Sequence, residues 1–158
     1  MIWARDFLLQ IQRCDRMVNN KLAEAAQWKA LALNTVSAPP PDTGVRVQSS
    51  SNQQKMSAAI DRYVDIEKEI DAYIDRLDVA RREVIEIIEK LDTVQYDVLH
   101  KMYVGVVDKN DSAMRTKYYT LNEIAESYDR SYSWAKGKRG QALKNVQRLL
   151  DARANETK

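Results

Sequence analysis

The chain has 158 residues, which is the length of one ordinary domain or of two small ones at most. Only four glycines and three prolines are present, whereas sandwiches and barrels of β-strands need many turns that draw on both residue types. Charged residues make up 30% of the chain and apolar residues 44%, a mixture typical of amphipathic helices. The composition therefore favours an all-α fold.

No apolar run approaches the roughly 20 residues that a membrane-spanning helix needs. Arg5 and Asp6 interrupt the apolar stretch near the N-terminus that an export signal would require. Cys14 is the only cysteine and His100 the only histidine, which excludes an internal disulfide and the usual Cys/His zinc sites. We therefore expect a cytoplasmic protein that contacts no membrane and uses no metal or other cofactor.

Charge is divided unevenly along the chain. Residues 1–112 hold 15 Lys and Arg against 18 Asp and Glu, whereas residues 113–158 hold ten against five. A basic segment behind a mildly acidic body suggests that the C-terminal part meets a polyanion. A basic tail that is simply solvated is the alternative interpretation.

Residues 2–33 are predicted to form one helix, because apolar residues recur at steps of three, four and seven and so share one face. These residues are Phe7, Leu8, Ile11, Cys14, Val18, Leu22, Ala25 and Ala32. Residues 34–52 contain three consecutive prolines, Gly44 and three consecutive serines, without a sustained period. We interpret them as a long linker between two helices that pack side by side.

Residues 53–91 carry the clearest pattern in the chain, an apolar heptad over five repeats. One set of residues is spaced by seven, and a second set follows it three residues later: Met56, Tyr63, Ile70, Leu77, Val84 and Leu91, then Ala59, Ile66, Tyr73, Ala80 and Ile87. This period predicts a left-handed coiled coil, and a single helix could not bury the apolar face alone. The N-terminal helix is the expected partner, which makes residues 1–91 an antiparallel hairpin. A second copy of the chain, in a homodimer, is the other candidate partner.

Residues 92–158 are predicted to form a second domain. Asp92 and Thr93 supply a helix N-cap signal. Residues 94–104 are then predicted to form a helix whose inward residues are Val98, Leu99, Met102 and Tyr103. Residues 105–119 are polar and irregular, which predicts a loop with its exposed tip at residues 108–111.

Two further helices form a predicted helix-turn-helix. Thr120 and Glu123 make a capping box ahead of a short helix over residues 121–128, whose inward residues are Leu121, Ile124 and Ala125. Asp129 and Arg130 form the turn, and Ser131 caps a final helix from residue 132 to about residue 152. The inner face of that helix consists of Ala135, Ala142, Leu143, Val146 and Leu150. A turn this tight lets the second helix project its far face into a major groove.

The segment resembles region 4 of the bacterial primary sigma factors, whose pattern is Thr-Leu-x-Glu-Ile-Ala/Gly, with Ala-Leu late in the recognition helix. The matching residues are Thr120, Leu121, Glu123, Ile124, Ala125, Ala142 and Leu143. The resemblance covers residues 92–150. It departs at Asp129, where the family has Gly, at Lys138, where the family buries an aliphatic residue, and at Gly137 and Gly140.

The layout of the whole chain is similar, more loosely, to a family of small phage transcriptional regulators of Firmicutes that includes late-gene activators. This resemblance implies regulation of phage or prophage genes. Likeness to sigma region 4 also implies host RNA polymerase as a partner, because that region binds polymerase as well as DNA. The chain has no counterpart of the sigma regions that open promoter DNA.

The helix period and the resemblance together predict a surface that binds double-stranded DNA. Its residues lie at the turn and on the outer face of the last helix: Arg130, Ser131, Tyr132, Ser133, Lys136, Arg139 and Lys144. Lys136 is the candidate for reading a base, because it can donate to the acceptors of guanine. Arg130, Arg115 and Lys117 are the candidates for phosphate contacts.

No Gly-rich phosphate loop and no nucleophile–base pair can be nominated, so we expect a protein that is not an enzyme. Three classes remain: a sequence-specific transcriptional regulator, which is favoured, a DNA-recognition subunit of phage packaging, and a coiled-coil interaction protein that targets host factors. A ring of many copies would indicate the packaging subunit. Failure to bind DNA in a salt-sensitive way would indicate the interaction protein.

Overall fold

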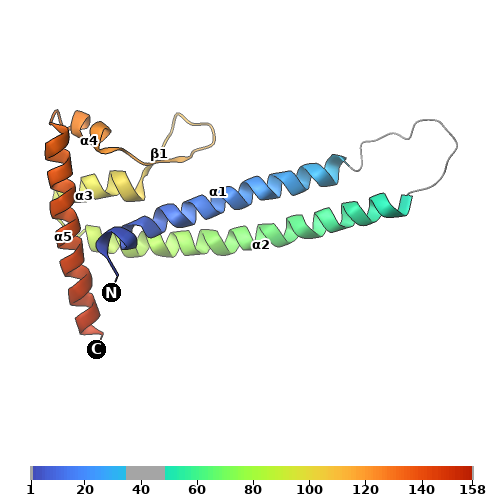
Figure 1. The fold of residues 1–158 in the computed structure, drawn as a ribbon, viewed down its shortest axis with the longest axis horizontal. Helices are drawn as coiled ribbons and strands as arrows, with labels where there is room; N and C mark the ends of the chain where they lie inside the picture. Colours follow the sequence, from blue (N-terminus) through green and yellow to red (C-terminus); the bar gives the residue numbers. More distant parts are fainter. Residues whose placement is uncertain (1, 35–48, 158) are drawn as a thin grey trace. The chain divides into compact units, whose positions relative to one another are not determined.

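The computed structural model describes residues 2–34 and 49–157, and these are largely helical, as the composition predicts (Figure 1). The elements are α1 (Ala4–Asn34), α2 (Ser49–Ile88), α3 (Thr93–Leu99), η1 (His100–Val104), β1 (Val106–Val107), β2 (Thr116–Lys117), α4 (Leu121–Ser127) and α5 (Tyr132–Glu156). Within these residues, no helix combines the length and the apolar character that crossing a bilayer would require.

The chain divides into two compact units, each of which contains part of α1 and part of α2. The hairpin unit is residues 14–76, and the terminal unit is residues 1–13 together with residues 77–158. The domain boundary expected between residues 91 and 92 therefore falls inside the terminal unit. The reason is that the first turns of α1 and the last turns of α2 share an apolar core with α5.

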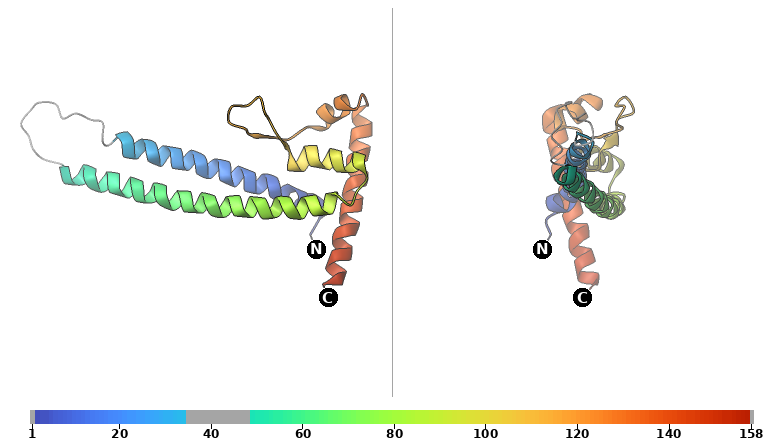
Figure 2. Two further views of the ribbon diagram at one scale, coloured as in Figure 1. Left: turned by 180° about the vertical axis from the view of Figure 1, so that it is seen from behind. Right: turned by 90° about the vertical axis from the view of Figure 1, so that its right-hand side faces the viewer.

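In the hairpin unit, α1 and α2 lie side by side and run antiparallel (Figures 1 and 2). Ala25 of α1 is buried against Ile66 and Ile70 of α2, and Trp28 and Tyr63 pack against this cluster. All eleven heptad residues are buried or half-buried, so the heptad and its pairing with the N-terminal helix are confirmed. Leu77 is only half-buried, although its central heptad position predicts burial, because two helices leave one flank of their seam open to solvent.

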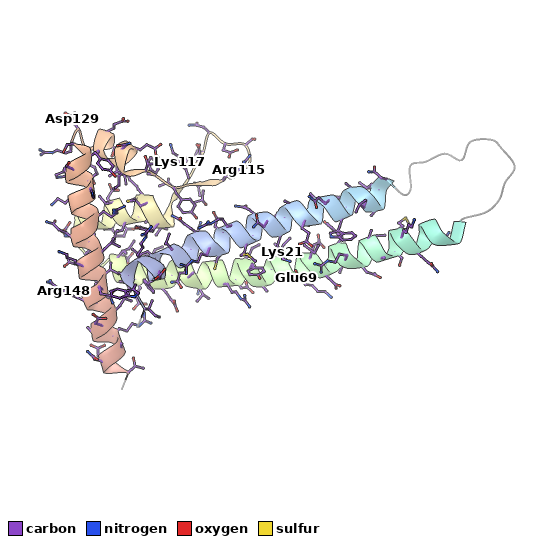
Figure 3. The ribbon with its side chains drawn as sticks, in the orientation of Figure 1. Lys21, Glu69, Arg115, Lys117, Asp129 and Arg148 are labelled. Carbon is purple, nitrogen blue, oxygen red and sulfur yellow. The ribbon has the colours of Figure 1, made fainter. Side chains whose placement is uncertain are left out.

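Four charged side chains form ion pairs across the hairpin. Lys21 Nζ lies 2.6 Å from Glu69 Oε2, and Arg62 Nη2 lies 3.0 Å from Glu24 Oε1 (Figure 3 labels the first pair). Each cation also reaches the other carboxylate, at 3.3 Å for Lys21 and Glu24 and 3.2 Å for Arg62 and Glu69. Antiparallel pairing brings these residues together, since the lower number on α1 meets the higher number on α2.

Both ends of the predicted linker, residues 34–52, belong to helices in the structure. Residues 35–48, which include the three prolines and Gly44, lie outside the described residues. The helix α1 extends to Asn34, and α2 already begins at Ser49, four residues before the predicted start. Serines have only moderate helix propensity, so the sequence pattern did not reveal that the heptad helix continues through them.

The core of the terminal unit is assembled from segments far apart in sequence. Leu8 and Ile11 of α1 pack with Val84 and Ile88 of α2, and Val146 of α5 closes the cluster. Two polar contacts tie the elements together: the backbone N of Ala4 donates to Gln147 Oε1 at 2.7 Å, and Gln12 Nε2 donates to the carbonyl O of Met102 at 2.8 Å.

The predicted helix over residues 94–104 is two elements rather than one. Asp92 caps α3 as predicted, and its Oδ1 accepts from the backbone N of Gln95 at 2.9 Å. After Leu99 the chain widens into the π-helical turn η1, which ends where the backbone N of Gly105 donates to the carbonyl O of His100. Gly105 has φ +80°, and a Cβ there would meet the Thr116 side chain and lie 2.9 Å from the carbonyl O of Lys117.

Residues 105–119, predicted to be an irregular loop, contain a short antiparallel strand pair. Val106 pairs with Lys117, and Val107 pairs with Thr116. The connecting loop turns with the help of Asp108 Oδ1, which accepts from the backbone N of Asn110 at 2.9 Å. Strands of two residues leave no alternating pattern in a sequence, so only the pairing itself identifies them.

Candidate nucleic-acid interface

The first helix of the predicted DNA-binding motif is fixed by its capping box. Thr120 Oγ1 accepts from the backbone N of Glu123 at 3.3 Å, and Glu123 Oε2 accepts from the backbone N of Thr120 at 2.8 Å. The backbone hydrogen bond from Thr120, followed by that from Lys117, lowers the pKa of Glu123. The inward residues of α4 are buried as predicted: Leu121, Ile124 and Ala125.

A tight turn joins α4 to α5. Asp129 has φ +50°, the left-handed conformation that Asp tolerates better than most residues, and it occupies the position where the sigma pattern has Gly. The backbone N of Arg130 donates to the carbonyl O of Ala125 at 2.9 Å. Ser131 then caps α5, since its Oγ accepts from the backbone N of Trp134 at 3.2 Å. The turn and both caps therefore lie where the sequence predicts them.

A hydrogen-bonded network holds Tyr128, the residue directly before the turn. The Tyr128 hydroxyl donates to Asp97 Oδ2 at 2.6 Å, and Lys101 Nζ donates to the same oxygen at 2.8 Å. Burial and the hydrogen bond to Asp97 raise the pKa of Tyr128 to about 12. Burial opposes ionisation of Asp97, but the hydrogen bonds from Lys101 and Tyr128 outweigh it and lower the pKa of Asp97. The rings of Tyr128 and Trp134 stand 5.1 Å apart, so the network also holds the first turn of α5.

The inner face of α5 matches the prediction. Ala135, Ala142 and Val146 are fully buried, and Leu143 and Leu150 are half-buried. Ala135 packs with Leu121 and Ala125, which allows α4 and α5 to approach closely because both alanines are small. The helix continues to Glu156, four residues past the predicted end.

Most of the predicted DNA-binding residues are exposed on the turn and the outer face of α5. The exposed ones are Arg130, Ser131, Tyr132, Ser133, Lys136 and Lys144. Arg139 differs from the prediction, because it is half-buried and its Nε is enclosed without a hydrogen-bond partner. Arg139 lies four residues after Ala135 and three before Ala142, so its side chain is next to the row of buried residues on α5. A Cβ placed at Gly137 or at Gly140 would meet nothing within 4 Å, so neither glycine is needed for packing inside the terminal unit.

Positive charge without any acidic residue distinguishes residues 130–150 from the rest of the sequence. Between residues 130 and 150 the sequence has no Asp or Glu and six cations: Arg130, Lys136, Lys138, Arg139, Lys144 and Arg148. Among residues 2–34 and 49–157, none of these six has a carboxylate within ion-pair distance. The four exposed ones, Arg130, Lys136, Lys144 and Arg148, are therefore available to a partner outside the unit.

Two of the predicted phosphate contacts are instead engaged inside the terminal unit. Arg115 Nε lies 3.1 Å from Asp111 Oδ2, and Lys117 Nζ lies 2.9 Å from Glu123 Oε1. Figure 3 labels both residues, Lys117 on β2 and Arg115 directly before it, whereas Asp129 marks the turn before α5. Of the three predicted phosphate contacts, only Arg130 has no ion-pair partner within the described residues.

Sequence reasoning missed two cations beside this surface, Lys90 and Arg148. Arg148 could have been found, because it lies four residues after Lys144 on the same side of α5. Figure 3 shows its side chain directed outward from α5. Nothing in the sequence signals Lys90, whose proximity to α5 depends on the packing of α3.

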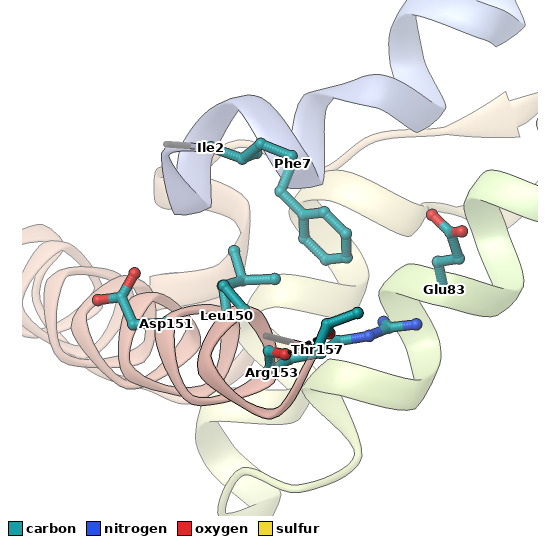
Figure 4. A pocket seen from close by; sticks show the side chains of 8 residues that line it. Ile2, Phe7, Glu83, Leu150, Asp151, Arg153 and Thr157 are labelled. Carbon is teal, nitrogen blue, oxygen red and sulfur yellow. Dashed lines mark hydrogen bonds between the residues drawn. The ribbon is translucent and has the colours of Figure 1, made fainter.

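A pocket in the terminal unit lies away from these residues. It has a volume of about 490 Å³, and Phe7 and Leu150 form its apolar side (Figure 4). Its charged lining consists of Glu83, Asp151 and Arg153, which gives an excess of negative charge. A phosphate would be repelled there, so this pocket does not extend the candidate DNA surface.

No cluster of three or more metal-ligating side chains occurs in the part of the chain that the structure describes. Comparison of the chain with protein-family models, with curated proteins and with solved structures finds no match.

Proposed function

We propose that this chain is a sequence-specific DNA-binding regulator of phage or prophage transcription, which acts with host RNA polymerase in the cytoplasm of a bacterium. In this proposal, α4 and α5 form a helix-turn-helix like that of sigma region 4, and α5 is the recognition helix. The protein acts by binding and catalyses no reaction.

The observation that carries the proposal is the unpaired positive charge exposed at the turn and on α5, at Arg130, Lys136, Lys144 and Arg148. Several cations elsewhere in the described chain, among them Lys21, Arg62 and Lys117, lie beside carboxylates. The six cations between residues 130 and 150 have no such neighbours. A surface that presents unpaired cations without interspersed carboxylates suits the phosphate backbone of a nucleic acid.

The local architecture supports the same function. The two caps and the left-handed residue Asp129 fix the angle at which α5 leaves α4. The buried face of α5 is held by small and branched apolar residues, and its opposite face is free. A recognition helix needs this combination, because its side chains must reach base edges from a rigid support.

Lys136 and Arg130 have different roles in this proposal. Lys136 lies one turn into α5 and is exposed, which suits a contact with the base acceptors in the major groove. Arg130 lies at the turn before the cap, where it would reach a phosphate rather than a base. Loss of a base contact relaxes sequence preference, whereas loss of a phosphate contact weakens binding to every sequence alike.

The experiment begins with selection of the preferred duplex from a random pool. Binding of Lys136→Ala and Arg130→Ala is then titrated on that duplex and on a scrambled one, at two salt concentrations. Lys136→Ala should lose about 1–3 kcal/mol on the selected duplex and little on the scrambled one. Arg130→Ala should weaken both and reduce the salt dependence.

Lys68→Ala, an exposed substitution on α2 in the hairpin unit, is the matched control and should bind as the wild type does. If both α5 variants fold by circular dichroism and bind as the wild type does, the DNA-binding face is not on α5. Co-purification of host polymerase with the tagged protein tests the polymerase contact separately, and its absence after crosslinking would remove that part of the proposal.

A further inference from the structure

A second pocket in the terminal unit lies directly beside the exposed face of α5. It has a volume of about 290 Å³ and forms where the turn between α2 and α3 meets the second half of α5. Its polar lining consists of Lys90 and Asp92 from the turn, Gln95 from α3, and Asn145 and Arg148 from α5. We refer to it as the 90/148 pocket.

The 90/148 pocket contains the side-chain amide of Gln95, whose donor atom is open to the pocket. Gln95 is only 7% exposed and is the only polar residue among the buried residues described. Its Oε1 accepts from Asn145 Nδ2 at 2.9 Å, but its Nε2 donates to none of the described residues. Unlike Arg139 Nε, this Nε2 is not enclosed, so it can donate to an acceptor that enters the pocket.

The charges around the amide favour an anion. Neither Lys90 nor Arg148 forms an ion pair within the described residues, and both line the pocket. Asp92 is the single carboxylate in the lining, and its Oδ1 is engaged as the cap of α3. Two free cations and one amide donor match the oxygens of a phosphate group.

The position of Arg148 places the pocket in line with the proposed recognition surface. Ser133, Gly137, Lys144 and Arg148 follow one another at steps of four, seven and four, so they share one side of α5. A helix of 25 residues is about 37 Å long, whereas a major groove is only about 12 Å wide. The second half of α5 must therefore leave the groove and cross the phosphate backbone beside it.

We propose that the 90/148 pocket binds one phosphate of the DNA backbone next to the sequence that the first half of α5 reads. Arg148 and Lys90 supply the charge, and Gln95 Nε2 donates a hydrogen bond to a phosphate oxygen. The inference rests on the proposed DNA-binding function, and it adds a contact that anchors the second half of α5.

The test compares Arg148→Ala and Lys90→Ala with Arg153→Ala on the selected and the scrambled duplex over a range of salt concentrations. Arg153 is a matched control, because it is an exposed arginine on the same helix that lines the other pocket. Arg148→Ala and Lys90→Ala should each weaken binding to both duplexes roughly tenfold. The slope of log K against log salt should fall by about 0.9 for each lost contact, whereas Arg153→Ala should leave it unchanged.

Phosphate ethylation interference locates the contact on the DNA. One phosphate beside the selected site should block binding of the wild type when ethylated, and the same ethylation should no longer matter to Arg148→Ala. If Arg148→Ala and Lys90→Ala bind like Arg153→Ala while Lys136→Ala loses sequence preference, the pocket proposal is wrong and the proposed function stands.

Two other outcomes also overturn the pocket proposal. If the wild-type protein binds no duplex, both the pocket proposal and the proposed function are wrong. If Arg148→Ala binds DNA normally but loses co-purification of polymerase, the pocket holds a carboxylate of a protein partner instead.

Discussion

The hydroxyl of Tyr128, at the end of α4, donates a 2.6 Å hydrogen bond to Oδ2 of Asp97 on α3. Lys101 donates to the same oxygen and also lies over the Tyr128 ring, 5.5 Å from its centroid. The pair thus connects the helix that precedes the motif to the turn that leads into α5. Rigidity of that turn matters, because it sets the direction of the proposed recognition helix.

Tyr128→Phe removes the hydroxyl and leaves Asp97 with Lys101. We expect the free energy of unfolding to fall by about 1–2 kcal/mol, because a hydrogen bond to a charged acceptor is lost while the ring stays in place. Urea unfolding measures this change. If the free energy of unfolding is unchanged, water replaces the hydroxyl without cost and the prediction is wrong.

The same variant gives a prediction for alkaline pH. The pKa of Tyr128 is raised to about 12, so its contribution to stability is complete below its ordinary pKa of about 10 and is lost as the pH rises toward 12. Lysines also titrate in this range, so the useful quantity is the difference between wild type and Tyr128→Phe. That difference should shrink between pH 10 and pH 12, and a constant difference would contradict the assignment.

His100 should make stability fall under mildly acidic conditions. Burial lowers the pKa of His100, and the charges of Arg81 and Lys101 add to this effect against the attraction of Asp97. A lowered pKa means that the stabilising contribution is present above about 6.5, the ordinary value, and is lost as the pH falls through the folded value. Urea midpoints at pH 7.5 and pH 5.5 should therefore differ more in the wild type than in His100→Gln.

Since His100 is the only histidine, its imidazole protons give a single resonance that can be followed by NMR. The titration midpoint should lie below 6.5. A midpoint at or above that value would show that the ring gains more from Asp97 than it loses by burial.

Burial along α2 predicts how much each substitution on this helix lowers the free energy of unfolding. Ile66 is fully buried, so Ile66→Ala should lower the free energy of unfolding by about 2–5 kcal/mol. Leu77→Ala should cost roughly half as much, because the side chain is half-buried. Val79 is 52% exposed, and Val79→Ala is the control, with an expected change within about 0.5 kcal/mol. Equal losses for Ile66→Ala and Val79→Ala would rule out the packing described for α1 and α2.

Gly137 and Gly140 should be replaceable with a gain in stability. A Cβ at either position meets no atom within 4 Å, and alanine has the higher helix propensity. Each substitution to Ala should raise the free energy of unfolding by about 0.5–1 kcal/mol, as measured in urea. Gly105→Ala is the contrasting control and should destabilise, because its φ of +80° and its neighbours exclude a side chain.

The DNA-binding assay then separates two interpretations of these glycines. If they allow close approach of a phosphate backbone, the stabilised variants should bind both the selected and the scrambled duplex more weakly. Unchanged affinity would mean that the glycines have no part in binding.

Local features of this protein could be predicted because their causes lie within a few residues. Thr120 and Glu123 satisfy backbone groups three positions apart, Ser131 caps the next helix in the same way, and Asp129 tolerates the left-handed turn. The heptad of α2 likewise indicates, from the spacing of apolar residues along the sequence, which side of the helix is buried. The outward positions of α5 follow from the same periodicity, and six of the seven predicted DNA-binding residues are exposed.

The remaining features depend on contacts between distant segments, which leave no local pattern. Pairing of Val106 with Lys117 creates strands too short to show an alternation, and packing against the buried row of α5 half-buries Arg139. Asp111 and Glu123 form ion pairs with Arg115 and Lys117, so these two cations are not part of the unpaired positive surface. Lys90, Gln95 and Arg148 come together only because α3 packs on α5. The sequence alone thus determined the helices, their caps and their faces, whereas tertiary packing decided which cations stay unpaired and where the amide of Gln95 remains open to a partner.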